Sequence, residues 1–266
     1  MANDKKAKNM DLQPLLEIAK TAAKKAAIEI LRIYESGDFS IEAKSDDSPL
    51  TKADKASHLA IVAELEKTDL PILSEEGREI PYEERKNWDY FWMIDPLDGT
   101  KEFIKKNGEF TVNIALIHQG APILGVVQVP VQNKLYYASQ NDGAYLDHND
   151  QGQKLATNSQ QPNAKGIKVV ASRSHLTDET QAFMDQLDAP EIVSMGSSLK
   201  LLAVAEGHAD IYPRFAPTME WDTAAAHAIV TEAGGKVLLK NSPMSVEYNK
   251  PNLLNPHFLV TCQLGE

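Results

Sequence analysis

Two aspartates stand three positions apart in the segment W-M-I-D-P-L-D-G-T, which spans residues 92–100. The apolar residues before Asp95 are typical of a buried strand, Pro96 is expected to end that strand, and Gly99 permits a tight turn. Asp95 and Asp98 should therefore meet at the end of a sheet, where open α/β sheets bind ligands. Neighbouring carboxylates repel each other unless a cation lies between them, and Mg²⁺ prefers such oxygen ligands. The segment predicts a magnesium site, although a D-x-x-D turn alone fits a solvated loop as well.

Three further acidic residues stand at the boundaries of predicted elements. Glu75 follows a short strand in S-E-E-G, Asp222 precedes an alanine-rich helix, and Asp54 stands three residues after Thr51. Each has a structural explanation: solvated surface for Glu75, a helix N-cap for Asp222, and the spacing of a capping box for the Thr51–Asp54 pair. A helix N-terminus also favours bound anions, so a cap at Asp222 does not exclude a functional role.

Apolar periodicity indicates which elements carry these residues in the first half of the chain. Residues 12–31 form a predicted amphipathic helix that ends near Gly37, and Thr51 begins a second helix. A short strand at residues 71–73 leads to S-E-E-G, and the strand at residues 90–94 is followed by a meander of strands. The first half is therefore predicted as two helices on a mostly antiparallel sheet.

The second half of the chain has a different pattern. Residues 149–166 are rich in Gln, Asn and Gly and mark the predicted boundary between the halves. Strands and helices alternate after it, which indicates a layered arrangement. The predicted fold class is α/β, an α+β layered sandwich of two tightly packed halves. Residues 1–155 carry most of the candidate metal ligands, and residues 156–266 carry Asp222 and the candidate substrate contacts.

Composition limits the classes of function. The 266 residues include 38 acidic and 27 basic side chains, for a formal net charge of −11. This charge argues against nucleic acid as the main partner, and an anionic substrate would need local cations. The single Cys262 excludes a disulfide within the chain and a cysteine metal cage, and its apolar surroundings predict a buried strand residue.

Targeting signals are not evident in the sequence. Residues 1–10 are rich in lysine, and no apolar stretch follows them, so they fit neither a signal peptide nor an anchor. No apolar run approaches the roughly 18 residues that a membrane span needs. The sequence therefore predicts a cytoplasmic protein.

Four motifs occur in a fixed order between residues 46 and 235: D-x-S-P-L-T-x-A-D, S-E-E, D-P-L-D-G-T and W-D-x-A-A. Together they resemble the inositol monophosphatase superfamily of Mg²⁺-dependent, lithium-sensitive phosphatases. K-E-F directly after D-G-T, then G-E-F-T-V-N, G-S-S-L-K and Y-P-R, are most similar to the 3′(2′),5′-bisphosphate nucleotidases of the CysQ type. Inositol-specific members typically carry T-N-F after D-G-T.

The resemblance implies two to three Mg²⁺ ions with defined ligands. The first ion would be held by Glu75, Asp95 and the carbonyl of Leu97. The second would be held by Asp95, Asp98 and Asp222, and Glu75 would also face a third, weaker ion. Bound metals lower the pKa of water and neutralise charge that develops on the phosphoryl group.

The resemblance also implies the catalytic and substrate contacts. Thr100 and Asp54 would orient the attacking water beside Glu75, and the Gly99 and Thr100 amides would receive phosphate oxygens. The residues implied to face the substrate are Asp98, Gly99, Thr100, His175, Ser197, Lys200, Arg214 and Asp222. Lys200 and Arg214 suit the 5′-phosphate or the base, although Lys200 also fits an exposed lysine in the first turn of a helix.

The implied reaction is hydrolysis of the 3′-phosphate of adenosine 3′,5′-bisphosphate to AMP and phosphate, within sulfur metabolism. The sequence does not separate this substrate from 3′-phosphoadenosine 5′-phosphosulfate. The resemblance admits peripheral association with the cytoplasmic face of the inner membrane, which nothing in the acidic chain indicates.

Three alternatives remain. A relative in the same superfamily would act on inositol phosphate or fructose bisphosphate. A haloacid-dehalogenase-like phosphatase would form an aspartyl-phosphate, but its signature has one residue between the aspartates, where this chain has two. A metal-binding scaffold without catalysis is disfavoured by the pair of Asp54 and Thr100 beside the metal ligands.

Overall fold

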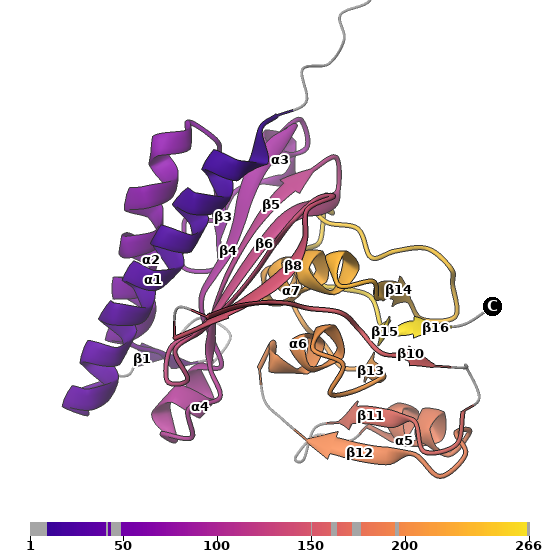
Figure 1. Cartoon of the computed structure of the whole chain (residues 1–266). Helices are drawn as coiled ribbons and strands as arrows, with labels where there is room; N and C mark the ends of the chain where they lie inside the picture. The colour runs from indigo at the N-terminus through magenta and orange to yellow at the C-terminus, as the bar shows by residue number, and fades with distance from the viewer. Residues whose placement is uncertain are drawn as a thin grey trace, which may run out of the picture.

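Helices and sheets alternate in layers across the molecule (Figure 1). The computed structural model describes residues 10–40, 42–43, 49–149, 151–160, 164–171, 177–194 and 197–264. Helices α1 (Leu12–Ser36) and α2 (Lys52–Leu65) cover one face of a seven-stranded sheet. Helices α6 (Leu199–Ala205) and α7 (Glu220–Glu232) lie between this sheet and a five-stranded one, and α5 (Asp178–Met184) packs on the far side. The predicted layered α/β class is confirmed.

The seven-stranded sheet is antiparallel except where its first strand pairs with its second. Its order along the sheet is β3 (Ile72–Ser74), β4 (Tyr90–Asp98), β5 (Thr111–His118), β6 (Ala121–Val129), β7 (Lys134–Ser139), β8 (Gly143–His148) and β9 (Gln151–Lys154). The mostly antiparallel sheet of the first half is therefore confirmed. Residues 149–166, the predicted boundary between the halves, contain β9, which extends this sheet. The polar, exposed side chains of β9 give no strand signal, and its backbone pairing decides its structure.

The five-stranded sheet is mixed. Its order is β12 (Glu191–Ser194), β11 (Lys168–Ala171), β13 (Ile211–Arg214), β15 (Phe258–Thr261) and β14 (Lys236–Leu239). β11 runs parallel to both of its neighbours, whereas β15 runs antiparallel to both of its own. The shorter elements are β1 (Glu42–Ala43), β2 (Pro49–Leu50), η1 (Glu66–Thr68), α3 (Tyr82–Arg85), α4 (Thr100–Ile104), β10 (Ser159–Gln160) and β16 (Gln263–Leu264).

Two large apolar clusters hold the layers together. One joins α1 and α2 to the seven-stranded sheet, where the alanines of α1 allow close packing. The other joins both sheets through α6 and α7, and it contains Cys262. Cys262 is 1% exposed, so its predicted burial is confirmed, but it lies between β15 and β16 and not in a strand as predicted. α1 ends as predicted, because Gly37 adopts φ 74° and its N–H donates to the Ile33 carbonyl. The division of the chain at residue 155 stays a prediction.

The strand that carries the two aspartates does not end at Pro96. β4 continues to Asp98 through a bulge, with Asp95 opposite Asn113 and Asp98 opposite Thr111. One residue of β5 thus faces two residues of β4. A bulge tolerates proline because the missing N–H is not needed by the ladder. The bulge also changes the directions in which Asp95 and Asp98 leave the sheet.

No helix within the described ranges combines the length and the apolar character that crossing a lipid bilayer requires.

β6 and α7 lie so close together that adding a single methyl group between them tests the contact. A Cβ added at Gly125 would lie 2.1 Å from the Ala225 carbonyl oxygen, in the backbone of α7. We expect Gly125→Ala to lower the free energy of unfolding by about 1–3 kcal/mol, because the helix must move away from the sheet. Gly152→Ala is the matched control, since nothing lies within 4 Å of its added Cβ. Urea unfolding measures both, and equal midpoints would contradict the close packing.

Candidate metal centre and substrate site

Three carboxylates from distant parts of the chain converge at one point. Oxygen atoms of Glu75, Asp95 and Asp222 all lie within 4.8 Å of one another. Glu75 follows β3, Asp95 lies in β4, and Asp222 lies in the first turn of α7. β3 pairs with β4, and α7 packs against β4, so the packing of the fold brings these three side chains together.

Asp95 is the most enclosed member of this carboxylate cluster. It is 1% exposed, and its Oδ1 accepts a hydrogen bond of 3.0 Å from the Leu97 N–H. Burial raises the pKa of Asp95 well above its usual range, and the charges of Glu75, Asp98 and Asp222 raise it further. Without a cation, this carboxyl group is therefore held in its protonated form over a wider pH range than an exposed aspartate.

Asp222 is not the N-cap of α7, so the structural explanation that the sequence offered beside a functional role is wrong. Met219 is the N-cap residue, and Asp222 is the third residue of the helix. From this position, Asp222 Oδ2 accepts a hydrogen bond of 2.9 Å from the Met219 N–H. The same oxygen accepts from the Thr218 hydroxyl at 2.6 Å. Burial and the nearby Asp98 raise the pKa of Asp222 to about 7. The helix therefore begins before Asp222, at Glu220, and the acidic side chain reaches back over its end.

Asp98 lies beside the cluster, but its carboxylate is hydrogen-bonded to the second half of the chain. Its Oδ2 accepts from the Ser197 hydroxyl and from the Ser198 N–H, the latter at 2.7 Å. The Thr111 hydroxyl lies 3.0 Å from the Ser197 hydroxyl and 2.7 Å from that of Ser198. Ser197 adopts φ 49°, a left-handed conformation that is uncommon for a residue with a side chain. Asp98 thus joins β4 to the start of α6.

Asp54 and Thr100 form a contact next to the carboxylate cluster. The Thr100 hydroxyl lies 3.1 Å from Asp54 Oδ1 and 3.3 Å from the Leu97 carbonyl oxygen. The predicted capping box is confirmed, because Asp54 Oδ2 accepts from the Thr51 N–H at 2.7 Å while Thr51 caps α2. Burial raises the pKa of Asp54, and hydrogen bonds from Thr51 oppose that rise. Gly99, at φ 95°, makes the turn that places Thr100 there.

Two cationic side chains lie on the Asp98 side of the cluster. Lys200 is only 8% exposed, which excludes the alternative of a solvated lysine, and its Nζ donates to the Ser197 carbonyl at 2.9 Å. Burial lowers the pKa of Lys200, while the charge of Asp98 raises it and that of Arg214 lowers it. Arg214 Nη2 donates to the Pro217 carbonyl at 2.6 Å, and its buried Nε has no hydrogen-bond partner. His175 lies outside the described residues.

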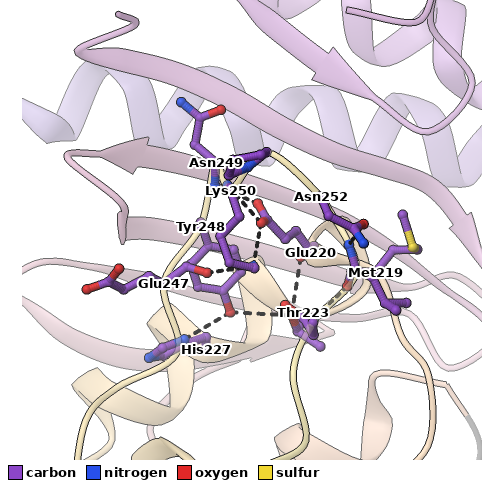
Figure 2. Close-up of polar contacts among 12 residues, drawn as sticks. Met219, Glu220, Thr223, His227, Glu247, Tyr248, Asn249, Lys250 and Asn252 are labelled. Carbon is purple, nitrogen blue, oxygen red and sulfur yellow. Dashed lines mark hydrogen bonds and ion pairs between the residues drawn. The ribbon is translucent and has the colours of Figure 1, made fainter. Parts of the chain in front are cut away.

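A buried polar network holds the start of α7 in place (Figure 2). Glu220 is 0% exposed and accepts from the N–H groups of Asn249 at 2.6 Å and Lys250 at 3.1 Å, and it also forms an ion pair with the Lys250 ammonium. The Tyr248 hydroxyl lies 2.9 Å from His227 Nδ1. The loop around residue 249 is therefore fastened to the helical turn that carries Asp222.

The donor set of the cluster suits a hard divalent cation. It consists of carboxylate oxygens, with no thiol or imidazole among the clustered ligands. In the part of the chain that the structure describes, no lysine, arginine or histidine forms an ion pair with Asp95 or Asp222. Buried like charges without a cationic partner are costly, so these residues fit a bound metal ion.

Sequence reasoning missed several polar residues that hold the acidic side chains. Thr111 and Ser198 lie within the motifs that carry the resemblance, but a motif does not tell that the Ser198 N–H donates to Asp98 or that the two hydroxyls contact each other. Thr218 stands four residues before Asp222, and a hydroxyl residue close to a helix start was an available signal. A cavity of about 550 Å³ beside Glu75, lined also by Arg78 and Trp221, could not be derived from sequence.

The chain is similar to known phosphatases over most of its length. Residues 11–257 match the family model of the inositol monophosphatase family. The 3′(2′),5′-bisphosphate nucleotidase CysQ of Salmonella typhimurium is 44% identical over 250 residues, which cover 93% of this chain and 99% of that protein. The corresponding protein of Escherichia coli K12 is 43% identical over 244 residues, which cover 90% of this chain and 96% of that protein.

Solved structures give the same result. The crystal structure of CysQ from Bacteroides thetaiotaomicron superposes with a TM-score of 0.86 at 44% identity, covering 97% of this chain and 100% of that one. The suhB protein of Bartonella henselae superposes with a TM-score of 0.75 at 24% identity, covering 94% of each chain, and so shares the fold. The chain belongs to the inositol monophosphatase family.

Proposed function

We propose that this protein is a Mg²⁺-dependent phosphatase that hydrolyses the 3′-phosphate of adenosine 3′,5′-bisphosphate to give AMP and phosphate. The observation that carries the proposal is the position of Asp98, which borders the buried carboxylate cluster and is hydrogen-bonded to the segment that carries Lys200. A site for cations and a site for a second anionic group are therefore adjacent. A bisphosphate nucleotide needs both.

In this proposal the acidic residues hold two to three Mg²⁺ ions. Glu75, Asp95 and the Leu97 carbonyl would hold one ion, and Asp95, Asp98 and Asp222 would hold another, with Glu75 facing a third. When bound, the ions would supply a water of lowered pKa and neutralise the charge that develops on the phosphoryl group. The raised pKa values of Asp95 and Asp222 support this assignment, because nearby positive charge would relieve their repulsion.

The chain's own groups orient the reactants. Asp54, fixed by Thr51, accepts from the Thr100 hydroxyl, and this leaves a lone pair of Thr100 to hold and direct the attacking water. The N–H groups of Gly99 and Thr100 would receive phosphate oxygens at the turn after β4.

The nucleotide would be recognised on the opposite side of Asp98. Lys200 and Arg214 would bind the 5′-phosphate, with Ser197 beside them, and His175 is proposed to contribute a further contact. The low exposure of Lys200 favours this role, because a charge-assisted hydrogen bond is stronger in a partly desolvated site.

The alternative enzymatic functions are excluded or disfavoured by the similarity of this chain to known proteins. The haloacid-dehalogenase-like reading is wrong, because the chain belongs to the inositol monophosphatase family. Specificity for inositol phosphate or fructose bisphosphate is disfavoured by the 44% identity to bisphosphate nucleotidases. We place the activity in the cytoplasm and in sulfur metabolism, with 3′-phosphoadenosine 5′-phosphosulfate as a second substrate and with inhibition by Li⁺.

Substrate preference tests the proposal directly. Phosphate release with Mg²⁺ should be fastest on adenosine 3′,5′-bisphosphate and slower on inositol phosphate and fructose bisphosphate. Lys200→Ala and Arg214→Ala should each lower kcat/KM on the nucleotide by roughly ten- to a hundredfold, since each removes a charged contact to phosphate. The same variants should change little on a small phosphate ester without the nucleotide.

Matched controls separate recognition from general effects. Lys24→Ala and Arg32→Ala remove cations whose side chains on α1 are 53% and 66% exposed, and both variants should behave like the unmodified protein. Equal losses on both substrates for Lys200→Ala would mean that Lys200 supports the fold. Faster hydrolysis of inositol phosphate by the unmodified protein would reject the proposed substrate.

The raised pKa values predict how pH acts on the metal-free protein. Because Asp222 titrates at about 7 in the folded state and near 3.8 when unfolded, folding favours its protonated form. Its contribution to stability is therefore lost as pH rises from 3.8 towards 7. In EDTA, replacing Asp222 with Asn should stabilise the protein more at about pH 8 than at about pH 5.

Comparing the Asp222→Asn variant with the unmodified protein isolates the contribution of Asp222 from that of other titrating groups. His227, whose pKa burial lowers to about 3, acts in the opposite direction. Its imidazole is protonated below about pH 6.5 in the unfolded protein but stays neutral in the folded protein, so stability is lost as pH falls from 6.5 towards 3. Urea unfolding at several pH values measures the difference, and saturating Mg²⁺ should reverse it. A stabilisation by Asp222→Asn that is the same at every pH would contradict the assigned repulsion.

A further inference from the structure

One face of α2 contacts three separate segments of the candidate metal centre. Asp54, Ser57 and His58 are spaced by three and four residues, so they lie on the same side of the helix. Asp54 contacts Thr100, as described above. Ser57 and His58, which neither the motifs nor the family resemblance singles out, extend this face along the helix towards Pro96 and Ser74.

Ser57 is hydrogen-bonded to the bulge of β4. It is 0% exposed, and its hydroxyl donates to the Pro96 carbonyl at 2.6 Å. Pro96 stands between Asp95 and Leu97, the two residues proposed to supply a carboxylate and a carbonyl to the same ion. The register of β4 with β5 is interrupted at this point, so the sheet itself does not fix the Pro96 peptide. Ser57 therefore supplies a hydrogen bond where the strand ladder does not.

His58 is hydrogen-bonded to the loop that carries Glu75. Its Nδ1 lies 2.9 Å from the Ser74 hydroxyl oxygen. The same oxygen accepts a hydrogen bond from the Glu76 N–H at 3.3 Å. Ser74 is buried, and its carbonyl accepts from the Gly77 N–H at 3.1 Å. The imidazole of His58 thus holds Ser74, directly before Glu75. Ser74 stabilises the following turn by accepting hydrogen bonds from Glu76 and Gly77.

The loop after Ser74 is bordered by a cavity on each of two sides. A cavity of about 550 Å³ lies on the side of α7, and a second of about 590 Å³ lies on the side of α2, where His58 lines it. Gly77, Arg78 and Ile80 line both cavities. With space on two sides, the loop depends on specific hydrogen bonds for its position, and the contact with His58 is one of them.

We propose that Ser57 and His58 are positioning residues. Through them α2 fixes the backbone directly after the proposed metal ligand Asp95 and directly before the proposed metal ligand Glu75. This inference rests on the proposed metal-dependent function. Neither side chain touches the substrate or the ions. Both act through Pro96 and Ser74, as outer hydrogen-bond partners do in other metal sites.

The test is Mg²⁺ binding by calorimetry for Ser57→Ala, His58→Ala and the double variant. Each single variant should raise the Mg²⁺ dissociation constant by roughly tenfold, as the loss of an outer hydrogen bond does in other metal sites. His58→Asn should recover most of the affinity, because its amide can reach the position of Nδ1. Ser36→Ala, which removes a hydroxyl bonded to the Ile33 carbonyl at 2.8 Å in α1, is the control.

Stability and affinity distinguish positioning from a merely structural role. A structural role would lower the urea midpoint in EDTA while leaving the Mg²⁺ dissociation constant unchanged, and this result would overturn the proposal. Should the double variant fail to fold, the single variants decide. An unmodified protein that binds no Mg²⁺ and does not hydrolyse the bisphosphate would defeat the proposed function. An active protein whose variants bind Mg²⁺ normally would defeat the positioning roles alone.

Discussion

Repulsion among buried carboxylates is the constraint on which the rest of this structure depends. Asp95 is 1% exposed, and the charges of Glu75, Asp98 and Asp222 all raise its pKa. Such a cluster disfavours folding unless protons or cations neutralise it. The surrounding fold must therefore supply the stability that the site removes. It does so through two apolar clusters and through the close contact between β6 and α7.

Three of the acidic side chains are also held by polar groups, which lie in another segment for Asp222 and Asp98 and in the same strand for Asp95. Thr218 holds Asp222, Ser197 and Ser198 hold Asp98, and the Leu97 N–H holds Asp95. These contacts fix the carboxylates in place before a cation arrives. In the proposed function, binding of Mg²⁺ returns the stability that the repulsion cost, so metal affinity and folding are coupled.

Local strand and helix patterns in the sequence predict the layered fold, whereas the meeting of Glu75, Asp95 and Asp222 is implied only by the family resemblance of the ordered motifs. The sequence does not predict that β4 continues through Pro96, since a bulge depends on pairing with β5. It offers Asp222 as the cap of α7, whereas the helix begins at Glu220, because the cap is a backbone property of Met219 that composition does not mark. The burial of Lys200 is likewise set by tertiary packing, and β9 is set by pairing with β8. Contacts with other segments account for the bulge, for the burial of Lys200 and for β9, whereas the start of α7 is set locally by the backbone at Met219.

The central claim is that the clustered carboxylates hold protons when no metal is bound. Proton release on Mg²⁺ binding measures this directly, by calorimetry at about pH 6 in two buffers of different ionisation enthalpy. With Asp222 titrating at about 7 and the pKa of Asp95 raised as well, the account predicts net release of protons that declines as the pH rises above 7. The same binding enthalpy in both buffers at about pH 6 would mean that no proton leaves, and it would contradict the account.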